Sequence, residues 1–339
     1  RQQSKPHDFL RNFELHTNLT NGRDLRKYRC LTAAQLCGVL RSRHQQCLCA
    51  TTTKWLLSPE DPKASAEGSL KCSVRWFNVC AVCLCVIRAG SGALTPLHLS
   101  FSVENGAKVV FCARGGAAGE ALEAELNKAG PGSCTFVSCD ISKEEDIKRL
   151  ISVTVERHGH IDCLVNNAGW HPPHKPTDDT TAEEFRDLLN LNLVSYFLAS
   201  KFALPHLRQR QGNIINVSSL VGTIGQRDAA PYVATKGAII SMTKAMAVDE
   251  SRFNVRVNCI SPGNVMTPLW EELAGQTPDA AAAIKAGENA QLMGRMGTEA
   301  ECGLAALYLA ADATFCTGID LLLSGGAELN YGFKSQIPS

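Results

Sequence analysis

From residue 103 onward the chain alternates short apolar segments with longer amphipathic ones, and this alternation limits the folds that it can adopt. The apolar segments, such as KVVFCA, IDCLVNN and GNIINVSS, are rich in Val, Ile and Cys. The segments between them, such as SKEEDIKRLISVTVERHG, place apolar residues at helical spacing. Continuously apolar strands separated by amphipathic helices are typical of a parallel sheet that helices cover on both faces. We therefore predict an α/β protein with a doubly wound, Rossmann-like parallel sheet, whose ligands bind at the carboxyl ends of the strands.

Residues 1–102 differ from the rest of the chain in composition and in pattern. Eight of the fifteen cysteines lie before Phe101, and residues 1–80 sustain neither a helical nor a strand period. We predict an atypical cysteine-rich extension at 1–102, a single domain at 103–333 and a tail at 334–339. A misjoined exon explains the extension; alternatively, residues 82–102 imitate the first strand and turn of the fold. The apolar run Trp76–Ile87 is too short to span a bilayer and fits a buried strand or core segment.

Charge and cysteine usage narrow the class of partner. The formal net charge of +1 gives no reason to expect nucleic acid or a membrane surface as the partner. The seven later cysteines stand singly in apolar runs, as reduced core thiols do, which favours the cytosol. Cys80-x-x-Cys83 resembles half of a zinc site, but a structural site needs a second such pair, so we expect no metal.

Three polar side chains are expected to meet where one strand ends. Ser219 follows the apolar segment 213–217, and Tyr232 and Lys236 lie four residues apart on one face of the next predicted helix. A phenol is a poor base at neutral pH, because its ordinary pKa is about 10. A nearby ammonium is expected to lower the pKa of Tyr232, so that the phenol exchanges a proton with a substrate hydroxyl, which Ser219 also holds.

Other motifs accompany this trio: VNNAG at 165–169, SPGNVMT at 261–267, and Cys139–Asp140. A serine thirteen positions before YxxxK, with NNAG and PGxxxT strand ends, resembles the short-chain dehydrogenase/reductase family from about Val103 to Tyr331. Finer stretches, among them NVSSLVGTIGQ, APYVATKGA and GGAELNYG, are similar to 17β-hydroxysteroid and L-fucose dehydrogenases within it.

The resemblance implies a role for each matching position. Tyr232 would be the acid/base, Lys236 would lower its pKa and bind the nicotinamide ribose, and Ser219 would orient the substrate oxygen. Asn192 would hold a water that links Lys236 to solvent, and Asp140 would bind the adenine amino group. The other implied cofactor contacts are Asn166, Ala168, Gly169, Pro262, Gly263, Val265 and Thr267, and the expected substrate contacts are His171, His174, Gln226 and Trp270, with Ser219 and Tyr232.

Simpler interpretations stay open for several of these residues. Asn192 could bridge groups within its own helix, and Asn166 and Asn167 could satisfy backbone groups at the strand end. Asp140, followed by Ser142, could act as a helix cap.

The chain departs from the family pattern in two places. The glycine-rich TGxxxGxG loop is missing from its expected position, because only Gly90 and Gly92 precede Gly106 and both lie too early. The segment between is ambiguous, since Leu97, Leu99 and Phe101 alternate like a strand whereas Thr95–Pro96 suits a helix start. The second apolar segment ends in Ala113–Arg114, where an acid would select NAD, so NADP is also admitted.

We therefore expect an NAD- or NADP-dependent oxidoreductase that interconverts a secondary alcohol with a ketone or lactone. The polar side chains favour an L-fucose-like sugar, with a 17β-hydroxysteroid such as estradiol as a second substrate. The alternative is a catalytically silent scaffold that lacks the phosphate-binding loop. A homotetramer is expected from the family and from apolar positions on two helices, which are Leu193, Phe197, Ile239, Met242 and Met246.

Overall fold

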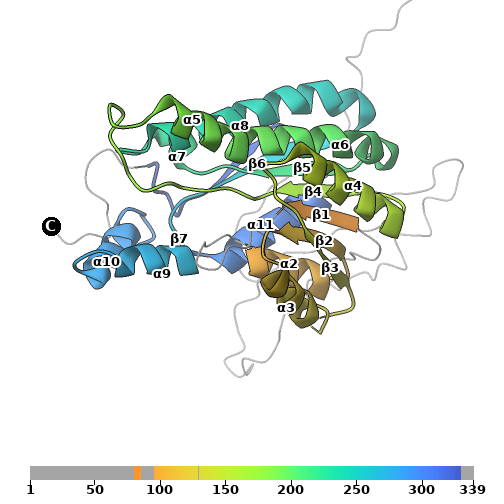
Figure 1. The fold of residues 1–339 in the computed structure, drawn as a ribbon, viewed down its shortest axis with the longest axis horizontal. Helices are drawn as coiled ribbons and strands as arrows, with labels where there is room; N and C mark the ends of the chain where they lie inside the picture. The colour runs from red at the N-terminus through yellow and green to blue at the C-terminus, as the bar shows by residue number, and fades with distance from the viewer. Residues whose placement is uncertain (1–79, 85–94, 129, 330–339) are drawn as a thin grey trace, which may run out of the picture. The chain divides into compact units, whose positions relative to one another are not determined.

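The computed structural model describes residues 80–84, 95–128 and 130–329. The chain divides into two units, Arg1–Ser69 and Leu70–Ser339, and every described residue belongs to the second. That unit is built on one parallel sheet with helices on both faces (Figure 1). The predicted doubly wound α/β fold is thus confirmed.

The sheet has seven strands in the order β3-β2-β1-β4-β5-β6-β9, all parallel to their neighbours. Chain order runs outward in one direction from β1 to β3 and in the other from β4 to β9, so the topology reverses between β1 and β4. Ligands of such sheets bind in the crevice at this reversal. The strands are β1 (Cys80–Leu84), β2 (Lys108–Ala113), β3 (Ser133–Ser138), β4 (Cys163–Asn166), β5 (Asn213–Val217), β6 (Arg256–Pro262) and β9 (Asp320–Leu323).

Strand β1 and the helix after it precede the boundary that the sequence predicted at residue 103. β1 pairs with β2 on one side and with β4 on the other, so it is central to the sheet. Thr95–Glu104 forms helix α2, which decides its ambiguous pattern in favour of a helix. The change in composition near residue 102 therefore does not coincide with the edge of the sheet. The short glycine segment at 89–92 and residues 1–79 of the proposed extension lie outside the described residues.

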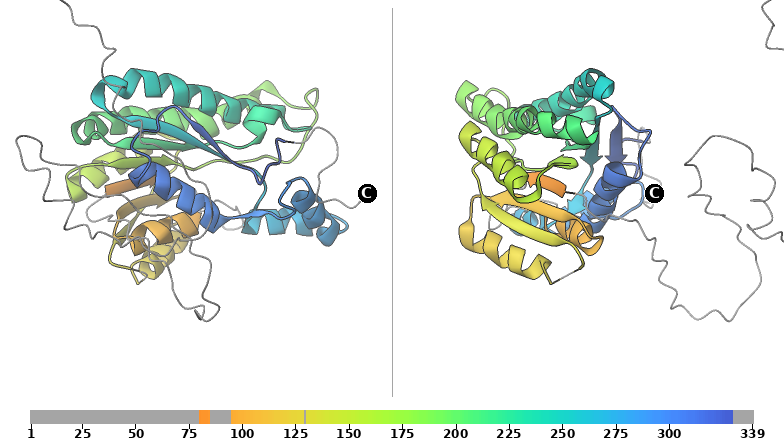
Figure 2. Two further views of the ribbon diagram at one scale, coloured as in Figure 1. Left: turned by 180° about the vertical axis from the view of Figure 1, so that it is seen from behind. Right: turned by 90° about the vertical axis from the view of Figure 1, so that its right-hand side faces the viewer.

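Alternate residues of each strand point to opposite faces of the sheet, which gives the domain two apolar cores. In β2, Val109 and Phe111 pack with α2 and α11, whereas Val110 and Cys112 pack with α4 and α6. Both sets are fully or almost fully buried, as expected for a strand covered on both sides. The helices of one face are α2, α3 (Gly116–Leu126) and α11 (Glu299–Ala311), and those of the other are α4 (Glu144–His158), α6 (Ser195–Arg210) and α8 (Ala230–Glu250) (Figure 2).

Smaller elements complete the carboxyl edge of the sheet. Helix α5 (Ala182–Leu189) runs through the π-helical turn Asn190–Val194 into α6, and the short α7 (Val221–Ile224) leads from β5 to α8. Helices α9 (Pro268–Gly275) and α10 (Ala280–Asn289) follow the two-residue strand β7 (Val265–Met266), which pairs with β8 (Gly297–Thr298). None of the described helices is both long and apolar enough to cross a bilayer.

Two expectations about side chains meet different outcomes. None of the seven cysteines from Cys112 to Cys316 forms a disulfide in the described part of the chain, and all but Cys316 are buried, as predicted. The proposed apolar outer faces are only partly correct. Phe197 is 53% exposed, but Ile239 is completely buried in a core shared by α6, α8 and β6, where Leu193 and Met242 also pack. Helical periodicity did not show that α8 buries this face within its own chain.

Candidate active site

Ser219, Tyr232 and Lys236 are brought together at the carboxyl edge of the sheet, as the sequence predicted. β5 ends at Val217, so Ser219 lies just beyond the strand, and its side chain is hydrogen-bonded to Tyr232. Lys236 is one helical turn further along α8, with its Nζ 5.7 Å from the centre of the Tyr232 ring. The Lys236 ammonium donates a hydrogen bond of 3.0 Å to the carbonyl oxygen of Val217, which ties the helix to the strand end.

Helix α8 is also held against β5 by close backbone packing. Ser218 Oγ donates to the carbonyl oxygen of Lys236 at 2.7 Å. A Cβ at Gly222 in α7 would lie 2.8 Å from the carbonyl carbon of Lys236, so only glycine allows α7 this close to α8. These contacts set the height of Tyr232 and Lys236 above the strand end.

Burial controls the protonation of both groups. It raises the pKa of Tyr232 to about 12, and the hydrogen bond with Ser219 opposes that rise. The predicted lowering of this pKa by Lys236 is therefore wrong for the chain alone, because removal of the phenolate from water outweighs the neighbouring groups. Burial likewise lowers the pKa of Lys236 to about 8, opposed by the nearby Cys259. Lys236 is only 4% exposed, so its ammonium has little access to water.

Asn192 lies in the π-helical turn and is completely buried. Its Nδ2 donates to the carbonyl oxygen of Trp170 at 2.9 Å and to Thr235 Oγ1 at 3.3 Å. Thr235 in turn donates to the carbonyl oxygen of Tyr232 at 2.8 Å. Sequence reasoning missed Thr235, although its position directly before Lys236 in YVATK was a usable signal. Asn192 therefore links the π-helical turn to the loop after β4 and to α8.

Several polar side chains lie next to Tyr232, and two of them come from the loop after β4. The ring of His171 lies with its centre 4.1 Å from that of Tyr232, and His171 Nε2 is 3.0 Å from Gln226 Oε1. His174 stacks on His171 at 5.3 Å and bonds the carbonyl oxygen of Arg227 at 3.0 Å. Three predicted substrate residues, His171, His174 and Gln226, thus form one cluster with the expected acid/base.

Trp270 is the predicted substrate residue that the described contacts do not join to this cluster. Its side chain packs over Gly287 in α10, where an added Cβ would lie 2.9 Å from indole Cη2. Its backbone N–H donates to Thr267 Oγ1 at 3.3 Å. The preceding Pro262, Gly263 and Val265 form the β6–β7 connection, with Gly263 donating to the carbonyl oxygen of Leu323 at 3.0 Å.

The predicted nucleotide-contacting residues differ in accessibility. Asn166 and Ala168 are completely buried, and Asn166 donates to Asn216 Oδ1 at 2.9 Å and to Ser200 Oγ at 3.2 Å. Gly169 is partly exposed; a Cβ there would lie 3.5 Å from both Lys236 Nζ and Asn192 Oδ1. An added methyl group would make ordinary contacts with both side chains, so Gly169 lies directly beside the lysine.

The adenine side of the expected site lies at the ends of β2 and β3. Ala113 ends β2 and is buried, whereas the next residue, Arg114, is exposed. Asp140 is partly exposed, and its Oδ1 accepts from the N–H and hydroxyl of Ser142 at 3.1 and 2.8 Å. This is a local turn and not the helix cap that the sequence left open for Asp140, because α4 has Lys143 as its N-cap and no side-chain cap. Its adenine contact stays a prediction.

Comparisons with known proteins agree with this geometry. The family model described as enoyl-(acyl carrier protein) reductase, a short-chain dehydrogenase model, matches residues 101–328. L-fucose dehydrogenase of Bos taurus is 57% identical over 233 residues, which cover 69% of this chain and 84% of the relative. Cyclopentanol dehydrogenase of Comamonas testosteroni is 32% identical over 72% of this chain and 96% of its own. The crystal structure of levodione reductase superimposes with a TM-score of 0.71 at 25% identity, covering 76% of this chain and all of that one.

The family match, the relatives and the serine, tyrosine and lysine at one strand edge lead to a single conclusion. The chain belongs to the short-chain dehydrogenase/reductase family, the NAD(P)-dependent oxidoreductases that act on CH–OH groups.

Proposed function

We propose that the chain oxidises a hydroxylated sugar of the L-fucose type at a secondary alcohol carbon, with Tyr232 as the acid/base. The observation that carries this proposal is the contact between Tyr232 and the His171–Gln226 pair. Imidazole and amide groups beside the expected proton carrier bind hydroxyls, and a site built to do so rejects analogues that lack them. The L-fucose dehydrogenases among the relatives support the same substrate class.

In the proposed reaction the substrate hydroxyl gives its proton to the phenolate oxygen of Tyr232, which Ser219 holds in place. The hydrogen leaves the carbon as a hydride, with both electrons of the carbon–hydrogen bond. The carbon–oxygen double bond of the ketone or lactone forms at the same carbon. NAD(P) supplies the hydride acceptor when it is bound. In the reverse direction the protonated Tyr232 donates to the carbonyl oxygen, and its raised pKa keeps that proton available at neutral pH.

The residues around Lys236 suit the ribose of a nicotinamide nucleotide. An ammonium has three N–H donors, and Val217 takes one of them. Two ribose hydroxyls would accept from the others beside Gly169, which has no side chain next to Lys236 Nζ. The charge of Lys236 next to Tyr232 would favour the phenolate during oxidation.

We infer that both NAD and NADP are accepted. Exposed Arg114 suits the extra phosphate of NADP, and buried Ala113 offers no carboxylate to the adenosine ribose of NAD. The test is kcat/KM for each cofactor in the wild type and in Arg114→Ala. Loss of activity with NADP alone supports the assignment, and equal loss with both contradicts it.

The substrate is tested by kcat/KM for L-fucose and for estradiol, the proposed second substrate. His171→Ala should lower the value for the sugar more than that for the steroid, because a sugar offers several hydroxyls to this cluster. Equal losses, or a steroid preferred by orders of magnitude, would remove the sugar assignment. Failure to bind or use either cofactor would instead favour a catalytically silent scaffold.

We further propose a cytosolic homotetramer. The segment that runs from α5 through the π-helical turn into α6 carries three exposed apolar side chains. They are Phe185, Val194 and Phe197, which are 36, 38 and 53% exposed. If these side chains form one apolar surface, it would suit a contact between copies of the chain. Light scattering at micromolar concentration should give four times the mass of one chain, and a monomer would contradict the proposal.

A further inference from the structure

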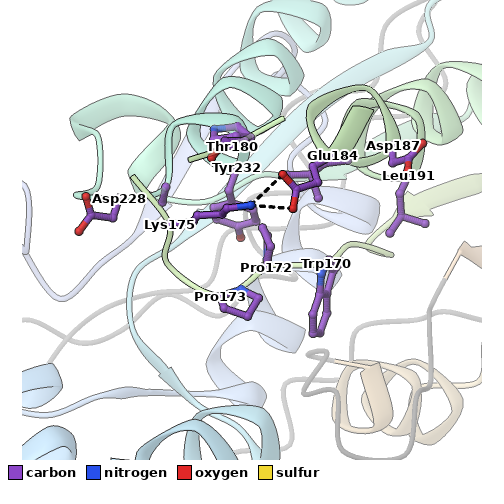
Figure 3. A pocket seen from close by; sticks show the side chains of 13 residues that line it. Trp170, Pro172, Pro173, Lys175, Thr180, Glu184, Asp187, Leu191, Asp228 and Tyr232 are labelled. Carbon is purple, nitrogen blue, oxygen red and sulfur yellow. Dashed lines mark hydrogen bonds and ion pairs between the residues drawn. The ribbon is translucent and has the colours of Figure 1, made fainter. Parts of the chain in front are cut away.

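A cavity of about 290 Å³ lies beside the proposed active site, between the loop after β4, helix α5 and the start of α8 (Figure 3). Trp170, Pro172 and Pro173 form one wall. Leu188 lines the cavity from α5, and Leu191 lines it from the π-helical turn after α5. Tyr232 also lines the cavity. Tyr232 is the one lining residue to which the proposed mechanism gives a role.

The loop from Trp170 to Lys175 separates the cavity from the His171 cluster. Trp170, Pro172, Pro173 and Lys175 line the cavity, whereas the intervening histidines contact Gln226, Arg227 and Tyr232 instead. The loop is fastened in this position because the N–H of Lys175 donates to the carbonyl oxygen of Asp228 at 2.7 Å. The cavity therefore lies on one side of the loop and the histidine contacts on the other, and Tyr232 takes part in both.

The charges around the cavity are largely balanced. Glu184 is paired with Lys175 through bonds of 2.9 and 3.0 Å, and Asp228 is paired with Arg227 at 3.3 Å. The third lining carboxylate, Asp187, is exposed on α5. Because Lys175 is already engaged, an anionic ligand would find little attraction. Because two of the three carboxylates are already paired, the cavity does not need a cationic ligand to balance their charge.

The lining suits a neutral ligand that has both apolar and hydroxyl-bearing faces. The faces of Trp170 and of two prolines accept the C–H face of a pyranose ring, and carboxylate oxygens accept hydrogen bonds from its hydroxyls. Charged acceptors make the stronger hydrogen bonds to such groups. A monosaccharide is small enough to enter a space of about 290 Å³.

We propose that this cavity is a second binding site for a neutral monosaccharide, separate from the site at which the alcohol is oxidised. Asp187 accepts hydroxyls of the sugar and Trp170 packs against its ring. The inference goes beyond the proposed function and rests on it only for the choice of L-fucose as the probe. A sugar held there touches Tyr232 without displacing His171 or Gln226.

The test is titration of the full, cofactor-free chain with L-fucose. Binding is measured by intrinsic fluorescence and, separately, by equilibrium dialysis. The chain has four tryptophans, and Trp170→Phe should remove the fluorescence change that the sugar causes. Asp187→Ala should raise Kd about tenfold or more, because it removes a charged hydrogen-bond acceptor. Asp178→Ala, in the exposed turn before α5 and outside the cavity lining, is the matched control and should leave Kd unchanged.

His171→Ala separates this site from the catalytic one. It should lower turnover of L-fucose and leave the Asp187-dependent Kd unchanged. Turnover without any Asp187-dependent binding overturns the second site and leaves the proposed function standing. Asp187-dependent binding without turnover keeps the second site and overturns the proposed substrate. A response of equal size to estradiol would show that the cavity does not select sugars and would also overturn the proposal.

Discussion

Asn192 holds the backbone of Trp170 by two hydrogen bonds, accepting from its N–H and donating to its carbonyl oxygen, each at 2.9 Å. The loop that carries His171 is therefore attached at its first residue to the π-helical turn after α5. Family resemblance implied a water-holding role for Asn192, and that role stays a prediction. The hydrogen bonds give the residue a positioning role as well.

Asn192→Ala should destabilise the fold by about 2–4 kcal/mol, because it leaves the partners of a buried amide without hydrogen bonds. Urea unfolding measures the change. Asn190→Ala is the control in the same turn, since Asn190 is exposed and its only side-chain bond among the described residues is a long one of 3.5 Å to Ser142. Equal losses of stability in the two variants would contradict a stabilising role for the hydrogen bonds of Asn192.

Tyr232→Phe should reduce kcat by about a hundredfold to ten-thousandfold, because the phenol oxygen is the proposed proton carrier. Tyr196→Phe is a matched control. Tyr196 is completely buried with its ring centre 5.9 Å from Lys236 Nζ, and its hydroxyl bonds only the backbone at Val217 among the described contacts. The Tyr196→Phe variant should keep wild-type turnover. A Tyr232→Phe enzyme with half the normal rate would end the assignment.

Oxidation by the wild type should accelerate as pH rises, whereas reduction should not. The pKa of Tyr232 is raised to about 12, so below that pH the fraction of phenolate grows with pH while the phenol stays the main form. The rise should be steepest below about pH 8, the pKa of Lys236, because the ammonium that favours the phenolate is lost above it. Initial rates in both directions at saturating cofactor measure this. An oxidation rate independent of pH from 6 to 8 would contradict it.

Lys236→Met should make stability less dependent on pH. The folded-state pKa of Lys236 is about 8, below the ordinary 10.5, so the unfolded chain binds more protons between these values. Wild-type stability should consequently rise with pH from about 8 to 10.5 through this group, by of order 3 kcal/mol. The variant should lack that increment. Chemical unfolding at pH 7, 8.5 and 9.5 tests it, before the ionisation of tyrosines intervenes.

Arg208→Met should destabilise the packing of α6 on α8 by about 2 kcal/mol, discounted for the partial exposure of the arginine. Arg208 makes two bonds of 2.7 Å to Glu250, whose side chain is only 6% exposed, and it stacks on Phe253 at 4.4 Å. Lys201→Met on the same helix should change stability by less than about 0.5 kcal/mol, since its 3.7 Å pair with Glu144 is exposed. Similar Tm shifts for both variants would contradict this ranking.

Local pattern was enough to predict the sheet and the meeting of Ser219, Tyr232 and Lys236. Strand ends of a parallel sheet share one edge, and a spacing of four places two side chains on one helical face. The pKa of Tyr232 was predicted in the wrong direction, because its burial depends on surrounding elements that are distant in sequence. The same limit applies to Ile239, which periodicity could place on a face but not assign to a particular neighbour.

The start of the fold was harder to predict for a different reason. CAVCL at 80–84 has the apolar character of a strand, but no standard glycine turn follows it at the expected distance. Pairing with β2 and β4 supplies the missing information, since a central strand is specified by two neighbours that lie later in the chain. The contacts of Asn192 with Trp170 and Thr235 likewise join residues 22 and 43 positions apart.

The π-helical turn at Asn190–Val194 contains one residue more than an α-helical path would need, and this keeps two buried side chains in phase. Leu188 and Tyr196 are eight positions apart, a spacing that regular α-helical winding would place about 80° away from a shared face. Both side chains are nevertheless buried, because the wider turn takes up the extra residue. Deletion of one residue within this turn should therefore be far better tolerated during evolution than a one-codon deletion in the regular part of α6.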